Sequence, residues 1–380
     1  MKQPSRREFL QLMAGAAAAG SGLELLLRQA ASRPLAWEQT RQPQAQTKPF
    51  KIGLISDLNS SYGSTSYGPT VERGVNLLLQ QKPDLVICAG DMVAGQKTSL
   101  TDRQLAAMWE GFETFVRRPL EAAGIPLLPA MGNHDASSQR SQGRWIYARE
   151  RQQASLFWNK HQKALPSGLM AANNFPFQYA WRGPGLFLVV MDASSATVSS
   201  AQRQWLSRTL KSPQRQQDDL CLVVGHLPLT AFSQGRARAG ECIHNAASLA
   251  ADLRQADVDL VISGHHHAWY PAEALGLRLL SLGAMGSGPR RLLGSSSASP
   301  ASLTLLDWSA SDQSISERTL NLNSFAEMQT DQLPTTIVAP GFAEARRRST
   351  QWQRPQRGSV VQPQQATKSP RWCAGAFRFN

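Results

Sequence analysis

Polar residues that can bind a metal ion follow five short apolar runs of this chain. Carboxylate, amide and imidazole groups are donors that Mn, Fe and Zn ions take in proteins. A single aspartate after one apolar run is the usual turn or helix cap, and a lone histidine is most often structural. Five such clusters in succession therefore favour a metal centre. The side chains concerned are Asp57, Asp91, Asn133, His226, His265 and His267.

The apolar runs have the length and composition of strands. Helical patterns over 70–81 and 105–123 alternate with the first three runs, which predicts a mostly parallel sheet flanked by helices. The crevice beyond the carboxyl ends of such strands is where open α/β sheets bind ligands. We therefore expect the five polar clusters to meet at one edge. The five runs are 51–56, 84–89, 125–130, 220–224 and 260–263.

The second half of the chain adds strands that predict antiparallel pairing. Residues 177–181 and 186–191 are expected to form a hairpin. The expected fold class is α/β, with a mixed two-sheet core covered by helices. Further helices are expected at 201–210 and 246–255, and further strands at 277–282, 303–308 and 315–320.

Four of the five clusters match a family pattern in order and spacing. Gly90-Asp91, Gly132–Asp135, Gly225-His226 and Gly264–His267 resemble the G-D, G-N-H-D/E, G-H and G-H-x-H blocks of the calcineurin-like metallophosphoesterases. The resemblance implies a four-layer αββα sandwich, with two mixed β-sheets flanked by helices, in a domain of residues 48–322. It also implies hydrolysis of phosphate mono- or diesters through a binuclear metal centre and a metal-bound hydroxide.

The resemblance assigns ligands to two divalent or trivalent ions, of Mn, Fe or Zn. The carboxylate of Asp91 would bridge both ions and fix their separation. The other ligands would be Asp57 and His267 at the first ion, and Asn133, His226 and His265 at the second.

The resemblance assigns catalytic roles to two neighbouring residues that do not bind metal. His134 would face the phosphate and give a proton or hydrogen bond to the leaving oxygen. Asp135 would fix the orientation of His134 and favour its protonated form. His266 is the middle of a histidine triplet and receives no ligand role.

The first cluster departs from the family pattern. It reads Asp57-Leu58-Asn59, so asparagine stands where the family has a second histidine. An amide oxygen is a weaker, neutral donor that suits harder metals. Three interpretations stay open: Asn59 ligates directly, a water takes its place, or the first site is weak.

Two further segments could contribute to a substrate pocket. The polar insertion 136–174 contains arginines and aromatic residues, among them Arg140, Trp145 and Arg151. It either caps the pocket or forms a solvated helical lid. The glycine-rich segment 283–288 either cradles phosphate through backbone N–H groups or is a structural turn, and the turn is favoured.

Residues 1–47 resemble a twin-arginine (Tat) export signal and a polar linker. Arg6-Arg7, Phe9 and Leu10 precede an Ala/Gly-rich stretch and then a polar run, in the order of such signals. The alternative is an amphipathic helix that begins with two arginines. The export machinery is thus an expected partner and the periplasm or the extracellular space the expected location. No later segment is typical of a transmembrane helix.

The formal net charge of +13 lies mostly towards the two ends. Residues 1–47 carry +3, residues 48–320 carry +5 and residues 321–380 carry +5. This distribution does not favour a nucleic-acid partner, so small phosphate esters are the expected substrates. Residues 323–380 are rich in Gln, Pro and Arg and are expected to form a flexible tail. A basic arm that binds nucleic acid or lipid is the alternative.

Two other functions remain possible from the sequence. A nuclease on the same scaffold is disfavoured by the modest charge of the central part. A scaffold that binds metal without turnover is suggested by Asn59, but the six other matching residues favour an enzyme.

Overall fold

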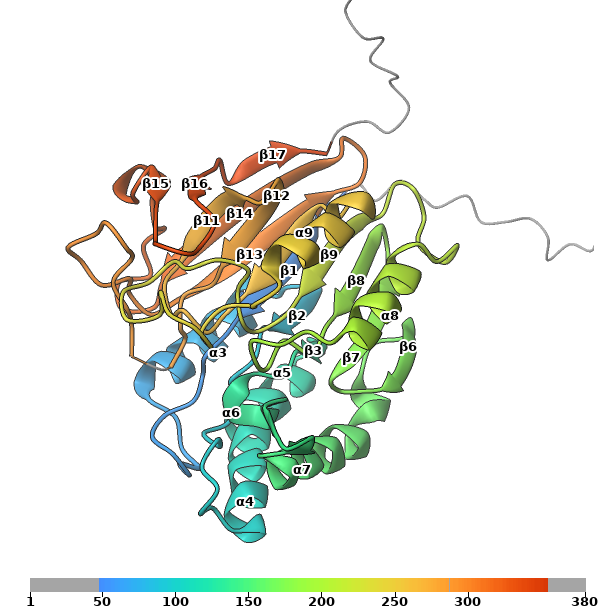
Figure 1. Cartoon of the computed structure of the whole chain (residues 1–380), viewed down its shortest axis with the longest axis vertical. Coiled ribbons are helices and arrows are strands. Elements are labelled where there is room, and N and C mark those ends of the chain that lie inside the picture. Colours follow the sequence, from blue (N-terminus) through green and yellow to red (C-terminus); the bar gives the residue numbers. More distant parts are fainter. Residues whose placement is uncertain (1–47, 287, 355–380) are drawn as a thin grey trace, which may run out of the picture. The chain divides into compact units, whose positions relative to one another are not determined.

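The structure is a computed structural model that describes residues 48–286 and 288–354. Two mixed sheets lie at its centre (Figure 1). The predicted export signal and the last 26 residues of the expected tail, 355–380, lie outside the described residues. A search of the described residues finds no helix long and apolar enough to cross a bilayer.

The first sheet has six strands in the order β17-β14-β13-β1-β2-β3. The first three strands of the chain are parallel neighbours, as their alternation with helices predicts. Strand β13 then pairs with β1 in the antiparallel direction, which makes the sheet mixed. The strands are β1 (Phe50–Ile55), β2 (Leu85–Cys88), β3 (Leu127–Pro129), β13 (Ser302–Ser309), β14 (Ser314–Asn321) and β17 (Gln351–Gln353).

The second sheet has nine strands in the order β15-β16-β11-β12-β10-β9-β8-β7-β6. Its centre is parallel from β8 to β12, and antiparallel strands flank it on both sides. The strands are β6 (Leu169–Asn174), β7 (Gln178–Gly183), β8 (Leu186–Val190), β9 (Leu220–Val224), β10 (Leu260–Ser263), β11 (Tyr270–Ala274), β12 (Leu277–Ser281), β15 (Thr336–Ile337) and β16 (Ala345–Arg347).

Helices cover the outer face of each sheet. In β8, Leu188 belongs to the core between the sheets, whereas its neighbours Phe187 and Val189 belong to a second core on the other face. This alternation follows from the two-residue period of a strand and means that both faces of the strand are buried. The second core includes apolar residues of helices α8 (Ser200–Leu210) and α9 (Ala246–Gln255), which lie over β8 and β9 (Figure 1).

The helices on the first sheet begin where the sequence indicates. Pro69 occupies the first turn of α3 (Pro69–Gln81), a position where its missing N–H costs nothing. Thr101 caps α4 (Asp102–Phe112) through a reciprocal bond with Gln104. The helix expected over 105–123 continues as a π-helical segment, Glu113–Arg117, and α5 (Arg118–Ala122). The observed architecture confirms the predicted α/β fold of two mixed sheets flanked by helices.

The folded part extends beyond residue 322, where the sequence suggested a tail. Strands β15 and β16 pair with the second sheet and β17 pairs with the first. The sequence does not indicate these strands, because the segment contains few large apolar residues. Each strand also pairs for only two or three residues, at a sheet edge or next to one. Residues 323–354 therefore belong to the folded domain.

A buried ion pair holds this segment to both sheets. Arg348 donates its backbone N–H to Pro271 of β11, and its Nη1 lies 2.8 Å from Oε1 of Glu317 in β14. Both side chains are nearly inaccessible, at 4% and 0% exposure. The pair thus connects the second sheet to the first.

Replacing Arg348 with alanine is expected to lower the free energy of unfolding by about 3–5 kcal/mol, because it leaves the buried Glu317 carboxylate unpaired. Arg346 provides the matched control, since its ion pair with Glu344 is exposed and screened by solvent, so its loss should change the stability little. Urea unfolding of the two alanine variants measures the difference. Equal losses would show that the Arg348 pair does not hold the segment.

Candidate metal centre

The five polar clusters meet where strands of both sheets end. Asp57 follows β1, Asp91 follows β2 and Asn133 follows β3, while His226 and His265 follow β9 and β10. The backbone N–H of Asp57 donates to the carbonyl of Gly90, at 3.0 Å. The N–H of His265 donates to Oδ2 of Asp57, also at 3.0 Å. The ends of the two sheets are therefore joined through the predicted ligands.

Four of these residues have a left-handed backbone. The φ angles are +54° at Asp57, +56° at Asp91, +65° at His265 and +50° at His267. Residues other than glycine rarely adopt this region, and such strain collects at functional sites. The chain therefore turns sharply at each strand end and directs these side chains to one place.

Glycine is required at the turn that precedes Asp91. Gly90 has φ of +99°, and a Cβ there would lie 2.6 Å from Nδ1 of His226 and 2.7 Å from the N atom of Gly132. Any larger residue would separate three of the predicted clusters. The need for glycine before Asp91 in the G-D block is therefore explained by steric exclusion at this position.

His226 is oriented for ligation by its Nε2 atom. Its Nδ1 donates to the carbonyl of Ala89 at 2.7 Å, which leaves Nε2 facing the other ligands. Nε2 lies 3.3 Å from Oδ2 of Asp91 and 3.0 Å from Oδ1 of Asn133. Burial lowers the pKa of His226, but the carboxylates of Asp91 and Asp57 outweigh it and raise the pKa to about 9. The anionic site thus favours a positive charge at this point.

Asp57 and His267 lie together as the expected pair of the first site. His267 Nε2 is 3.1 Å from Oδ1 of Asp57, and its Nδ1 donates to the carbonyl of Gly288. Burial raises the pKa of the Asp57 carboxyl, but His267 and His226 lower it below its usual value overall. The carboxylate is therefore ionised, as a metal ligand must be.

Asn59 lies close to these residues in the chain but its ligand role stays a prediction. Its side chain is only 3% exposed, and its backbone N–H donates to the carbonyl of Asp91 at 3.1 Å. The turn that carries Asn59 is therefore fixed against the turn that carries Asp91.

The expected second site brings in two residues that the sequence did not single out. Oε2 of Glu241 lies 2.8 Å from Nε2 of His265, and Nη1 of Arg236 lies 3.3 Å from the same nitrogen. Arg236 also pairs with Glu241. Burial lowers the pKa of His265 to about 4, against the opposing effect of Glu241. The only sequence feature that could have indicated these two residues is the charged loop 236–241 between β9 and α9. This loop is separated from the polar clusters along the chain, so the sequence does not connect it with them.

The donor set fits a bound cation. Single ligand atoms of Asp91, His226 and His265 lie within 4.8 Å of one another, and all three residues are buried. Burial raises the pKa of the Asp91 carboxyl, but His226 and His134 lower it well below its usual range overall. An ionised carboxylate and two buried imidazoles are the ligands that Zn, Mn and Fe take. These three residues belong to the expected second site.

His134 lies beside the predicted metal ligands, but Asp135 does not orient its ring. The ring Nδ1 donates to the carbonyl of Gly95 at 3.0 Å, and Nε2 lies 4.0 Å from Oδ2 of Asp91. The Asp135 carboxylate instead accepts from the backbone N–H groups of Asp91, Val93 and Gly132, at 2.7–2.9 Å. Its role is thus to fix the turns after β2 and β3. Burial and the nearby Asp91 raise the pKa of Asp135 to about 7.

Two other side chains complete the surroundings of His134 and the histidine triplet. The exposed Tyr62 packs on the ring of His134, with centroids 5.3 Å apart. His266 accepts from the N–H of Phe232 through Nδ1, and its Nε2 lies 3.1 Å from the carbonyl of Glu241. Both ring nitrogens of His266 thus contact backbone, and its role is structural.

The glycine-rich segment supports the first site as a turn. The N–H groups of Met285 and Gly286 donate to the carbonyls of Ser56 and Asp57, so neither is directed to a ligand. A Cβ at Gly286 would overlap the carbonyl oxygen of Leu58, whereas one at Gly288 would meet nothing within 4 Å. The segment therefore packs directly against the Asp57 turn.

Substituting alanine for Gly286 is expected to cost about 1–3 kcal/mol of unfolding free energy, because the backbone at Leu58 has no room to move away. The same change at Gly288 is expected to have little effect. Thermal unfolding and metal content of both variants test this, since displacement of Asp57 should also weaken metal binding. A Gly286→Ala variant with the stability and metal content of the wild type would contradict the close packing.

A family comparison is consistent with this geometry. The model of the calcineurin-like phosphoesterases (Metallophos) matches residues 50–269. The chain belongs to this family. Calcineurin-like phosphoesterases are metal-dependent hydrolases, and the matched region contains every predicted ligand and both predicted catalytic residues.

Solved structures with similar folds are distant in sequence. A dimetal phosphatase from Danio rerio is 15% identical, with 72% of this chain and 96% of that chain covered and a TM-score of 0.45. GAP50 of Plasmodium, an anchor in the inner membrane complex, is 12% identical, with 74% and 87% covered and a TM-score of 0.46. At this distance neither protein indicates a substrate for this chain.

Proposed function

We propose that this member of the calcineurin-like phosphoesterase family hydrolyses phosphate mono- or diesters with two metal ions. The observation that carries the proposal is the position of the buried Asp91, whose carboxylate lies between His226 and His134 at the meeting point of the two sheets. We assign Asp57, Asp91 and His267 to one ion, with Asn59 as a candidate fourth ligand. We assign Asp91, Asn133, His226 and His265 to the other.

Two cations bound there would polarise the phosphoryl oxygens. They would also lower the pKa of water, so that a nucleophile is available at neutral pH. The protein groups have separate tasks. Asn133 is held by Gln96, which accepts from its Nδ2 at 2.6 Å, so its Oδ1 faces His226. The Nδ1–H of His134 donates to the carbonyl of Gly95, so the ring would give a proton to the leaving oxygen from Nε2 in its imidazolium form, with both ring nitrogens protonated. Arg236, which also pairs with Glu241, lies beside His265 and would attract a phosphate anion through its charged guanidinium.

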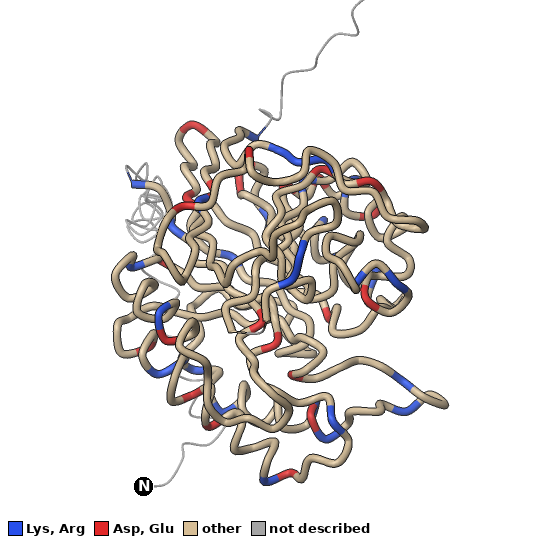
Figure 2. Tube along the Cα trace, turned by 90° about the vertical axis from the view of Figure 1, so that its left-hand side faces the viewer, with Lys and Arg blue, Asp and Glu red and all other residues tan. Residues whose placement is uncertain are grey.

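A nuclease is the second candidate, and the described surface gives it little support. In the view of Figure 2, the positions of Lys and Arg are interspersed with those of Asp and Glu along the trace. Double-stranded DNA is held mainly by continuous positive charge, which neutralises several phosphates at once. Small phosphate esters therefore remain the preferred substrates.

Hydrolysis assays test the proposed function. The purified protein should cleave p-nitrophenyl phosphate or bis(p-nitrophenyl) phosphate, lose the activity after chelation, and regain it with Mn, Fe or Zn. Failure to cleave either ester in the presence of these metals would favour a scaffold that binds metal without turnover.

We also propose that the enzyme acts outside the cytoplasm, as the twin-arginine motif indicates. Changing Arg6 and Arg7 to lysine should retain the protein in the cytoplasm, because the pair is the recognised part of such signals. Cell fractionation of the wild type and this variant measures the effect. Equal distribution of the two proteins would contradict export by this route.

A further inference from the structure

A large polar cavity opens beside the proposed second metal site. Its volume is about 1060 Å³. Two of the proposed metal ligands, Asn133 and His265, line its wall together with Gln96. This volume is at the upper end of the range for sites that hold drug-sized ligands. A phosphate group alone would fill a small fraction of it. Since the cavity shares ligand residues with the metal centre, an ester bound there would extend its alcohol part into this space.

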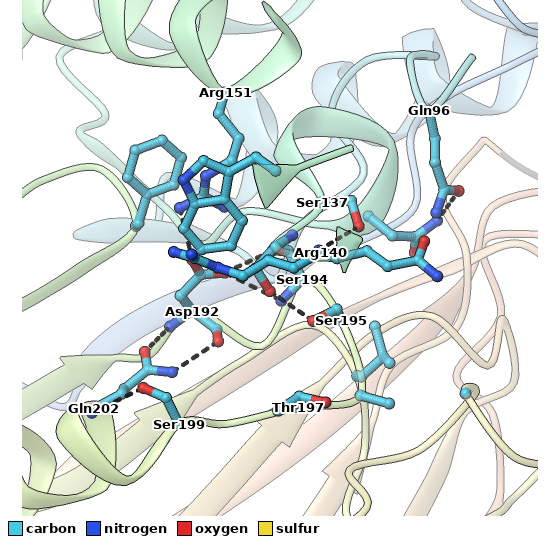
Figure 3. Close-up of a pocket in the computed structure, with 18 of the residues that line it drawn as sticks. Gln96, Ser137, Arg140, Arg151, Asp192, Ser194, Ser195, Thr197, Ser199 and Gln202 are labelled. Atoms are coloured by element: carbon cyan, nitrogen blue, oxygen red, sulfur yellow. Dashed lines mark hydrogen bonds and ion pairs between the residues drawn. The ribbon is translucent and has the colours of Figure 1, made fainter. Parts of the chain in front are cut away.

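The wall away from the metals consists largely of small hydroxyl and amide side chains. Ser195 and Thr197 lie on one side of it (Figure 3), and Ser138, Gln139 and Gln152 also line the cavity. The hydroxyls of Ser138 and Ser195 are 2.7 Å apart. Each hydroxyl has one donor and two acceptor positions, so the pair retains capacity for a ligand. Such a wall offers many hydrogen bonds and few apolar contacts.

The aromatic residues of the cavity are already covered by arginine side chains. The guanidinium groups of Arg140 and Arg151 lie 3.4 Å and 4.4 Å from the ring centre of Trp145. Arg151 also lies 3.8 Å from the ring centre of Phe177. Arg151 is fixed there by Asp192, whose Oδ2 is 2.8 Å from its Nη2. Each of these two rings therefore has at least one face occupied by an arginine of the protein itself, which disfavours stacking on a nucleobase.

The hydroxyl cluster is also held rigidly, as a recognition surface requires. Ser194 donates to Oδ1 of Asp192 at 2.5 Å, and the N–H of Ser138 donates to Ser194 Oγ at 2.9 Å. Gln202 of α8 accepts from the N–H of Asp192 and donates to its carbonyl. Asp192 thus fixes both the arginine stack and the serine loop, and this fixed arrangement reduces the entropy lost on binding.

We propose that this cavity binds a polyhydroxylated alcohol part of the substrate, such as a cyclic polyol or sugar, in preference to an acyl chain or a nucleobase. The inference rests on the proposed phosphoesterase function and specifies its substrate class. Serine, threonine and amide groups would exchange hydrogen bonds with the ligand hydroxyls. Arg140 would contribute further N–H donors at the outer wall, since its guanidinium is exposed and pairs with no carboxylate among the described residues.

Two matched phosphates test the proposal with the wild-type protein. Inositol phosphate and cyclohexyl phosphate share a six-membered ring and differ in the hydroxyl groups. We expect kcat/KM to be about tenfold or more higher for inositol phosphate, equivalent to about one net hydrogen bond. Adenosine monophosphate should not exceed it. If only diesters are cleaved, the p-nitrophenyl diesters of inositol phosphate and cyclohexyl phosphate give the same comparison.

Cavity-filling variants then locate the preference. Thr197→Trp and Ala239→Trp fill the space from two different segments, and each should reduce the inositol-to-cyclohexyl ratio about tenfold, towards one. Thr335→Trp, an exposed position outside the cavity, should leave the ratio unchanged. Two fillers keep the test valid if one of them fails to fold.

The outcomes separate this inference from the proposed function. No hydrolysis of any ester, p-nitrophenyl esters included, would refute the phosphoesterase proposal itself. Hydrolysis of p-nitrophenyl esters without a preference for inositol, or with a preference that both fillers leave intact, would refute the cavity assignment alone. A kcat/KM for adenosine monophosphate above the values for both inositol phosphate and ribose 5-phosphate, which has the sugar without the base, would show that the cavity recognises a base.

Discussion

Replacing Asp91 with alanine is expected to lower kcat/KM by about 10³-fold or more, equivalent to about 4 kcal/mol of transition-state stabilisation. Its Oδ2 lies 3.3 Å from His226 Nε2, and its Oδ1 accepts from the backbone N–H of His134 at 2.9 Å. The proposed bridging role makes it the one ligand shared by both ions. Loss of both ions from the purified variant, measured by mass spectrometry of metals, should accompany the loss of turnover.

Asp91→Asn provides the matched control for this prediction. The amide retains an oxygen for the N–H of His134 and the volume of the side chain, but it removes the negative charge. We expect a folded protein that still binds metal poorly. Wild-type metal content and turnover in either variant would exclude Asp91 as the bridging ligand.

Replacing His134 with alanine is expected to preserve metal content and to lower kcat by about 10²–10⁴-fold on esters of simple alcohols. Such alcohols leave as strong bases, so they need a proton in the transition state. The ring reaches the site through Nε2 because its Nδ1 is bound to the carbonyl of Gly95. For p-nitrophenyl esters, whose leaving group is stable as an anion, the loss should be much smaller.

The dependence on the leaving group distinguishes proton donation from a structural role. His161, which packs on Phe157 with ring centres 4.7 Å apart, is a histidine outside the site. His161→Ala should leave the ratio of kcat for alkyl and p-nitrophenyl esters unchanged. An equal loss on both esters in His134→Ala would mean that His134 does not protonate the leaving group.

The strands that end at the site could be predicted from the sequence, because each is a short apolar run with a polar cluster directly after it. The runs 220–224 and 260–263 match β9 and β10 residue for residue. Strands that are neither apolar runs nor followed by a polar cluster could not be predicted. β6 (Leu169–Asn174) ends in two asparagines and lies within the polar insertion 136–174, and β16 contains two arginines. These two strands are defined by their pairing partners rather than by their own hydrophobicity.

The residues that meet at the candidate site were predictable from residue type and order, but their neighbours were not. Glu241 and Arg236 reach His265 from a loop that carries no motif. The partner of His134 was assigned to the adjacent Asp135, whereas the structure gives that place to the carbonyl of Gly95. Backbone groups carry no sequence signal, so contacts of this kind require the folded structure.

The most direct measurement of the proposed binuclear centre is a crystal structure of the metal-loaded protein with anomalous scattering. We expect two anomalous peaks that share Asp91 as a ligand, with ligand distances of about 2.0–2.3 Å. One peak should contact Asp57 and His267, and the other should contact Asn133, His226 and His265. A single peak would reduce the centre to one ion, and the absence of any peak at Asp91 would contradict the account.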